Sequence, residues 1–245
     1  MVDQFEARRT SFGARAAAYD RVRPGYPDAG VRWVIGTGSP VVVDLGTGTG
    51  RLGVRCRALG ASPIGIEPDP DMAAIAAPAL PGGTVRAKAE HVPLADGRAD
   101  AVVAGQAWHW FDHAATVAEC GRILRPGGRL GVFRNVRDER EPWVAAFGDI
   151  IGGEDRTRSG SFMAHELQFG DPFLGGDQQD FAHRHRLAAS ELVALAATHS
   201  YVSTRSDAAD VLAEVDELVR SHPGLVGRDA VDVPYVCRVT RAVRR

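Results

Sequence analysis

The sequence of 245 residues contains three cysteines, one lysine and no long apolar run, and these shortages limit the classes of protein it can belong to. Cys56, Cys120 and Cys237 are odd in number and far apart, so neither a disulfide framework nor a Cys-x-x-Cys zinc site is indicated. No stretch approaches the about 18 apolar residues of a membrane-spanning helix. Residues 1–10 are charged and lack an apolar stretch, so we predict no signal peptide and a reducing, cytoplasmic location.

An excess of basic residues is also lacking. The chain carries 29 Lys and Arg against 31 Asp and Glu, a formal net charge of −2. Proteins that bind nucleic acid draw much of their affinity from neutralising phosphates, so the charge predicts no nucleic-acid partner. The hydrophobic fraction of 44% and the charged fraction of 24% are typical of a soluble enzyme that buries a sizeable core.

Short apolar runs alternate with helical stretches between residues 41 and 134. We expect strands at 41–43, 64–66, 84–87, 101–103 and 129–133, and helices at 50–59, 69–77 and 112–124, the last ended by a turn at 126–128. This alternation predicts a parallel sheet with right-handed crossovers. Further helices are expected at 190–198 and 208–220, and a terminal strand at 231–243 is expected to form an antiparallel hairpin with a strand near 180–187.

A glycine-rich turn follows the first expected strand, in residues 43–53 (VDLGTGTGRLG). Glycines there let the backbone approach a ligand where a Cβ would collide with it. Gly48, Gly50 and Gly53 match the GxGxxG pattern of dinucleotide-binding proteins. Asp44 at the strand end, however, would repel the pyrophosphate of a dinucleotide. A ligand with an ammonium group and no phosphate would instead be favoured, and S-adenosylmethionine is such a ligand.

A second acid, Glu67, lies 23 residues after Asp44, at the end of the second expected strand. A carboxylate at that place can accept hydrogen bonds from both hydroxyls of a ribose. The two acids and the glycines together therefore indicate an adenosyl ligand.

The region from residue 40 to residue 134 resembles a class I S-adenosylmethionine-dependent methyltransferase of the small-molecule type, with a methyltransferase 11-like domain. Residues 44–50 (DLGTGTG) resemble the family's first motif and residues 65–68 (GIEP) its acidic ribose loop. Residues 89–94 (AEHVPL), 106–111 (QAWHWF) and 122–128 (RILRPGG) match its later motifs in order, and residues 19–27 (YDRVRPGYP) resemble the N-terminal segment of one subgroup.

The resemblance implies an α/β fold: a Rossmann-like, seven-stranded, mostly parallel sheet with helices on both faces, an antiparallel C-terminal strand and a lid or cap. It divides the chain into an N-terminal helical segment over the active site (1–38), the cofactor-binding core (39–135), a cap or substrate region (136–207) and a C-terminal helix and strand that complete the sheet (208–245). Its cofactor-binding residues would be Asp44, Gly46, Thr47, Gly48, Gly50, Glu67, Pro68, Met72, Ala89, Glu90 and Gln106.

One position departs from the family pattern. Many relatives carry an acidic or hydroxyl residue before the Ala-Glu pair, where it holds the adenine amino group, but Lys88 stands there in this chain. Lysine has no acceptor, so that contact has to come from another group.

The expected fourth strand delivers polar and aromatic residues to the carboxyl edge of the sheet, where open α/β folds bind ligands. His109 is the candidate base or acceptor-orienting residue, or else a histidine hydrogen-bonded under the lid. Of two tryptophans there, we expect one in the core and one facing the pocket. The candidate acceptor contacts are Tyr19, Arg23, Tyr26, Trp108, Trp110, Tyr201 and Arg205; packing against a surface turn or a solvated charge is the alternative for those outside this edge.

A metal site is not predicted. His109 and His113 are four residues apart, but the first precedes the expected helix and Asp112 suits its N-cap. The sequence therefore predicts direct in-line transfer of a methyl group from S-adenosylmethionine to a small molecule, with S-adenosylhomocysteine as product and no nucleic-acid or membrane partner. The alternatives are a module that binds an adenosyl ligand without methyl transfer, and an NAD(P)-dependent oxidoreductase that rests on the GxGxxG pattern.

Overall fold

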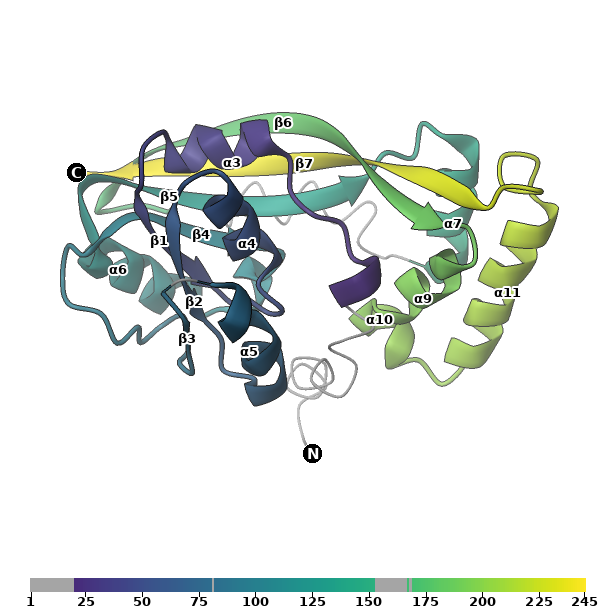
Figure 1. The fold of residues 1–245 in the computed structure, drawn as a ribbon, viewed down its shortest axis with the longest axis horizontal. Coiled ribbons are helices and arrows are strands. Elements are labelled where there is room, and N and C mark those ends of the chain that lie inside the picture. Colours follow the sequence, from purple (N-terminus) through teal and green to yellow (C-terminus); the bar gives the residue numbers. More distant parts are fainter. Residues whose placement is uncertain (1–19, 81, 153–166, 168) are drawn as a thin grey trace. The chain divides into compact units, whose positions relative to one another are not determined.

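Seven strands form one mixed sheet in the computed structural model, which describes residues 20–80, 82–152, 167 and 169–245. The strands are β1 (Val41–Leu45), β2 (Ser62–Ile66), β3 (Thr84–Val85), β4 (Ala99–Gly105), β5 (Leu124–Arg137), β6 (Phe173–Ala188) and β7 (Ala230–Arg244). Their order is β3-β2-β1-β4-β5-β7-β6, and all the pairs from β3 to β5 are parallel (Figure 1). The parallel core with antiparallel C-terminal strands confirms the predicted fold class.

The described residues divide into two compact units, each built from separate stretches of chain. We call residues 25–80, 82–135, 167, 169–181 and 237–245 the Rossmann unit. Residues 20–24, 136–152 and 182–236 form the helical unit. Strands β5, β6 and β7 each contribute residues to both units.

Helices cover both faces of the sheet in the Rossmann unit. On one face, α3 (Asp28–Ile35) and α4 (Arg51–Ala58) pack with Val42, Ala101 and Phe133. On the other face, α6 (His113–Ile123) packs with Val43 and Val102, which directly follow Val42 and Ala101 in their strands. Such alternation follows from the two-residue period of a strand. The remaining elements are α5 (Pro70–Ala76), η2 (Ala77–Ala79) and η3 (Trp108–Trp110).

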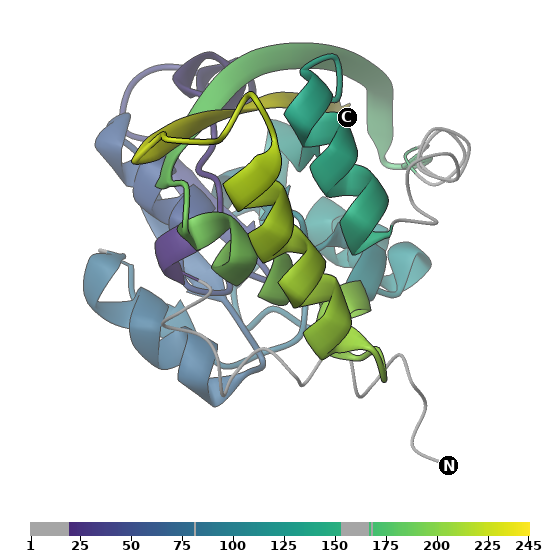
Figure 2. The ribbon, with the colours of Figure 1, turned by 90° about the vertical axis from the view of Figure 1, so that its right-hand side faces the viewer.

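The helical unit has a core of its own. Helices α7 (Pro142–Ile151) and α9 (Glu191–Ala197) pack against α11 (Ala208–Ser221), and the short α10 (Ser200–Ser203) follows α9 (Figure 2). Apolar side chains of all four helices are buried together, among them Phe147, Leu192, Leu195, Val202 and Val215. The predicted helices at 190–198 and 208–220 are therefore confirmed to within a residue or two at each end.

The junction of α6 with β5 differs from the prediction. The expected turn at 126–128 lies inside β5, which begins at Leu124 instead of Arg129. The register shifts there, because Ala99 pairs with Leu124 while Ala101 pairs with Arg129. The turn-forming residues are thus absorbed into a bulge, in which Gly127 has a φ of 75°.

All three cysteines are unpaired thiols buried in the Rossmann unit. Burial raises the pKa of the Cys56 and Cys120 thiols far above the usual value, and raises that of Cys237 to about 12. Among the helices that the structure describes, none has both the length and the apolar composition needed to cross a membrane.

Candidate cofactor site

Asp44 fastens the two ends of the glycine-rich loop between β1 and α4. Its carboxyl is 1% exposed, and Oδ2 accepts hydrogen bonds from Thr47 Oγ1 (2.6 Å) and from the Gly53 backbone N–H (2.9 Å). A Cβ at position 53 would lie 3.2 Å from that oxygen and 2.9 Å from Leu80 Cδ2, so a larger residue would require both side chains to shift. The loop is thus held in shape by the acid that precedes it.

The Asp44 carboxyl titrates close to neutral pH. Burial raises its pKa to about 7, the negative charge of Glu67 adds to the effect, and the two hydrogen bonds oppose it. A positive charge placed near this carboxyl would favour its ionised form.

Glu67 connects the glycine-rich loop with the loop that follows β2. Its Oε2 accepts from the Gly48 N–H (2.8 Å) and its Oε1 from the Asp69 N–H (3.0 Å). The parallel pairing of β1 with β2 sets Leu45 opposite Ile66, so both acids lie at the carboxyl edge of the sheet. Gly48 has a φ of 56°, and a Cβ built on it would meet no atom within 4 Å, so the loop faces open space at this residue.

The predicted adenine-side residues lie in α5 and in turns, where hydrogen bonds and packing hold them in place. Asp69 caps α5 by accepting from the Asp71 and Met72 N–H groups, and the Met72 side chain is buried. Ala89 is buried in the core, and Glu90 accepts a 2.9 Å hydrogen bond from the Asp112 N–H. Pro68 is half-buried and Lys88 is exposed.

Gln106 directly follows β4 and has a left-handed backbone, φ 56°, which is uncommon for a residue with a side chain. Its N–H donates to Phe133 O, and its Nε2 donates to Asn135 O at 3.0 Å. Asn135, which the sequence analysis missed, is buried and donates to Gly25 O at 2.9 Å. No pattern in the sequence marks Asn135, because Arg134 precedes it and Arg137 follows two residues later.

Tyr26 lies against Gly105, where a Cβ would collide with the phenol ring, and its ring meets Phe133 edge to face at 5.8 Å. The glycine in β4 thus makes room for a predicted acceptor contact. Gly46 is restricted in the same way, because a Cβ there would lie 2.7 Å from the Ala107 Cβ.

The aromatic residues after β4 separate into a buried member and accessible ones. Trp108 is 3% exposed and packs on Phe169 with a centroid distance of 5.5 Å, so it is the tryptophan of the core. Its Nε1 has no hydrogen-bond partner among the described residues. His109 is exposed, and its ring lies 4.7 Å from that of the half-buried Trp110.

Three further predicted acceptor contacts belong to the helical unit. Arg23, in the helical unit, donates to Thr198 O at 2.7 Å. Arg205 forms an ion pair with Asp207, and the Tyr201 ring lies 5.0 Å from that of His199. Tyr19 lies outside the described residues.

His199 is a buried histidine that the sequence analysis did not single out, and no sequence pattern marks it. Its Nδ1 lies 2.9 Å from Leu195 O, and its Nε2 lies 3.2 Å from Arg137 Nη1. Burial, with the charges of Arg23 and Arg137, holds its pKa well below the usual value. The ring is therefore neutral, with Nδ1 donating to the carbonyl and Nε2 accepting from the guanidinium.

Within the described ranges, no three His, Cys, Asp or Glu side chains are grouped so that they could hold a metal ion. Asp112 accepts from the Ala115 N–H as the N-cap of α6, and His113 Nε2 lies 3.1 Å from Trp108 O.

Comparisons with known proteins identify the family to which the chain belongs. A profile described as a methyltransferase domain matches residues 43–132. An uncharacterized methyltransferase of Mycobacterium tuberculosis is 36% identical over 235 residues, 95% of each chain. An uncharacterized methyltransferase-like protein of Schizosaccharomyces pombe is 27% identical, over 96% of this chain and 95% of its own. A solved structure from Anaeromyxobacter dehalogenans, assigned to the type II methyltransferases, shares the fold with a TM-score of 0.65 at 22% identity, over 91% of this chain and 97% of its own.

Proposed function

Because the chain belongs to the class I S-adenosylmethionine-dependent methyltransferases, we propose that it transfers a methyl group from S-adenosylmethionine to a small molecule. The reaction is a direct in-line displacement, and S-adenosylhomocysteine is the second product. The observation that carries this proposal is the pair of buried acids, Asp44 and Glu67, hydrogen-bonded to the glycine-rich loop at the carboxyl edge of the sheet.

The loop supports the proposed cofactor because Gly48 leaves open space beside backbone that the two acids hold in shape. Glu67 is the acceptor for the ribose hydroxyls. A carboxylate offers about four acceptor positions, so binding the ribose is compatible with holding the loop. Gly46, Thr47 and Gly50 shape the same loop. Pro68, Met72, Ala89 and Glu90 line the adenine side.

Asp44 recognises the ammonium group of the methionine portion. Because its carboxyl is 1% exposed, we expect it to act by its charge and through the loop backbone, without direct contact. Gln106, held by Phe133 and Asn135, positions the same end of the cofactor.

S-adenosylmethionine supplies the activated methyl group when it is bound. The chain has to bring an acceptor into line, and proximity and orientation can lower a barrier by roughly 7–11 kcal/mol. His109, exposed beside Trp110, orients the acceptor or removes its proton. Tyr26 is the other candidate contact in the same unit. The net charge of −2 favours a small molecule over a nucleic acid.

Calorimetric titration with S-adenosylhomocysteine, and with NAD as the control, tests the cofactor. We expect binding of the first and none of the second, and binding of NAD alone would overturn the proposal. A screen for acceptor-dependent formation of S-adenosylhomocysteine then tests the transfer. Binding without turnover for any acceptor would favour a module that only holds an adenosyl ligand.

Substitution His109→Ala separates acceptor chemistry from cofactor binding. The dissociation constant for S-adenosylhomocysteine should stay unchanged, because the exposed side chain does not shape the loop. Turnover should fall by about 10²–10⁴-fold if His109 is a general base. If affinity and turnover fell equally, His109 would be assigned to cofactor binding and not to the acceptor chemistry.

A further inference from the structure

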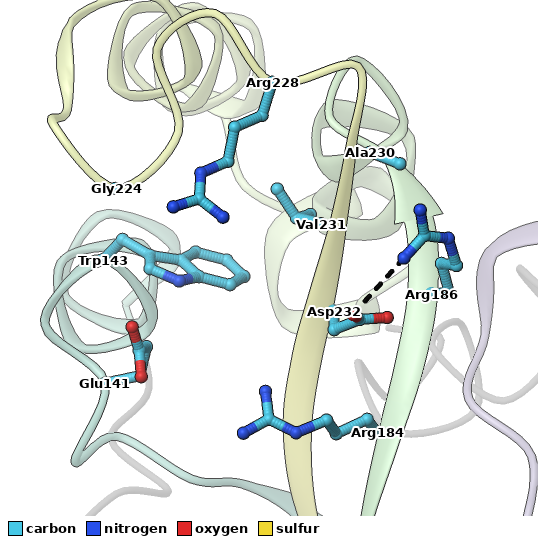
Figure 3. Close-up of a pocket in the computed structure, with 9 residues that line it drawn as sticks. All are labelled: Glu141, Trp143, Arg184, Arg186, Gly224, Arg228, Ala230, Val231 and Asp232. Carbon is cyan, nitrogen blue, oxygen red and sulfur yellow. Dashed lines mark hydrogen bonds and ion pairs between the residues drawn. The ribbon is translucent and has the colours of Figure 1, made fainter.

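The helical unit contains a cavity with a volume of about 370 Å³ (Figure 3). All nine residues that line it belong to this unit, and the charged ones are Glu141, Arg184, Arg186, Arg228 and Asp232. Arg184 and Arg186 project into it together, because residues two apart on β6 share one face of the strand. A volume in this range suits a small molecule.

Positive charge exceeds negative charge around the cavity. Three guanidinium groups face it against two carboxylates, and Arg186 pairs with Asp232 at 3.3 Å. Within the part of the chain that the structure describes, neither the Arg184 nor the Arg228 guanidinium forms a hydrogen bond or ion pair, although the charge of Arg184 contributes to the lowered pKa of the Asp138 carboxyl. Figure 3 shows them on different sides of the same space.

The wall beside these arginines is fixed in place. Trp143 is 5% exposed and belongs to the core of the unit. A Cβ on Gly224 would lie 3.1 Å from Cδ1 of Trp143, so the loop that contains Gly224 passes close to the indole ring. Nδ1 of His222 accepts a 3.0 Å hydrogen bond from the Gly224 N–H and holds that loop. The indole N–H of Trp143 has no acceptor among the described residues, and Figure 3 shows it on the ring edge toward Arg184 and Glu141.

We propose that this cavity binds a small molecule through a doubly charged oxyanion, of which a phosphate group is the best match. Arg184 and Arg228 bring two guanidinium groups to the same space, where the Glu141 carboxylate offsets one of their charges. A phosphate group offers three strong acceptor oxygens, which can accept from both arginines. The planar guanidinium matches phosphate and carboxylate oxygens bidentately. The inference is independent of methyl transfer, because no residue of the cavity belongs to the Rossmann unit.

Calorimetric titration of the full chain with pyrophosphate, inorganic phosphate and malonate tests the site. We expect pyrophosphate and phosphate to bind, and malonate to bind more weakly. Malonate binding alone would overturn the preference for phosphate, and no binding by any of the three would overturn the site. Arg184→Ala and Arg228→Ala should each weaken binding by roughly tenfold, and the double variant should abolish it.

Two further variants separate a built site from general surface charge. Arg220→Ala removes one positive charge from α11, where Arg220 pairs with Asp216 and Glu217 outside the cavity, and it should leave the affinity unchanged. Asp232→Asn removes a carboxylate and releases Arg186, so binding should tighten. Equal loss in the Arg220 and Arg184 variants, or no gain in the Asp232 variant, would overturn the proposal. Unchanged affinity for S-adenosylhomocysteine in every variant would verify that the chain is folded and would keep the cofactor proposal separate.

Discussion

Asp44 in the Rossmann unit and His199 in the helical unit are both buried, and the pKa of each moves toward the neutral form, but their surroundings differ. In the Rossmann unit, Asp44 accepts hydrogen bonds from the Thr47 hydroxyl and the Gly53 N–H, which favour the anion that burial opposes. In the helical unit, His199 lies near the positive charges of Arg23 and Arg137, which oppose the cation as burial does. Asp44 can therefore ionise when a ligand brings positive charge, whereas His199 is held neutral.

The difference gives the two groups opposite effects on stability. The folded protein raises the pKa of Asp44 from 3.8 to about 7, so its contribution to stability is greatest below pH 3.8 and is lost as the pH rises toward 7. The pKa of His199 is lowered from 6.5, so its contribution is present above pH 6.5 and is lost as the pH falls. Near neutral pH the first group costs stability and the second does not.

The largest expected effect is that of Asp44→Asn on cofactor affinity. Asparagine can keep both hydrogen bonds through one carbonyl oxygen, because Thr47 and Gly53 share Oδ2, but it removes the charge. At pH 8 we expect S-adenosylhomocysteine to bind about 100-fold more weakly, because a full charge a few ångströms away contributes on the order of 3 kcal/mol at an effective dielectric constant of about 20, even without direct contact. Wild-type affinity should fall as the pH drops below about 7, whereas the affinity of the variant should not.

The control ligand is 5′-methylthioadenosine, which lacks the ammonium group and should bind both proteins equally. Without ligand, the variant should be more stable than the wild type in urea at pH 8, and the two should converge near pH 4. Equal loss of affinity for both ligands would show that Asp44 only shapes the loop. Its charge would then have no role in binding, and Asp44 would not differ from His199 in this respect.

Glu67→Ala should have a smaller effect. We expect the binding free energy of S-adenosylhomocysteine to weaken by about 1–3 kcal/mol, because the ribose hydroxyls are left without an acceptor. The 2′-deoxy analogue of this ligand is the matched probe. Wild type should prefer the ligand with both hydroxyls, and the variant should show much less preference in calorimetry. An unchanged dissociation constant would contradict the ribose assignment.

The smallest expected effect is that of His199→Gln, which keeps a donor and an acceptor but does not titrate. Between pH 7.5 and pH 5.5 the wild type should lose roughly 1 kcal/mol of unfolding free energy relative to the variant, up to about 1.4 kcal/mol per pH unit below 6.5. Amide hydrogen exchange in α9 would report this. A parallel pH dependence in both proteins would mean that His199 is not held neutral.

The sequence predicted the features that depend on neighbouring residues. Apolar runs located β1, β2 and β4, and Asp112 marked the start of α6, because strand burial and helix capping are local. The start of β5 was predicted wrongly, because Pro126 and the glycines after it indicate a turn, whereas pairing with β4 turns them into a bulge. Asn135 and His199 were missed, because each has a hydrogen-bond partner far along the chain, 110 residues away for Asn135 and 62 for His199.

The three buried cysteines can report local opening of the folded chain, because a thiol reacts only when it becomes exposed. All three thiols are buried in the Rossmann unit, and their raised pKa values leave almost no reactive thiolate in the folded protein. The stretches that form the helical unit contain no cysteine. The alkylation rate of each cysteine, followed by mass spectrometry, would therefore report local opening of the Rossmann unit at three positions without an introduced label. Opening of the helical unit would give no alkylation signal.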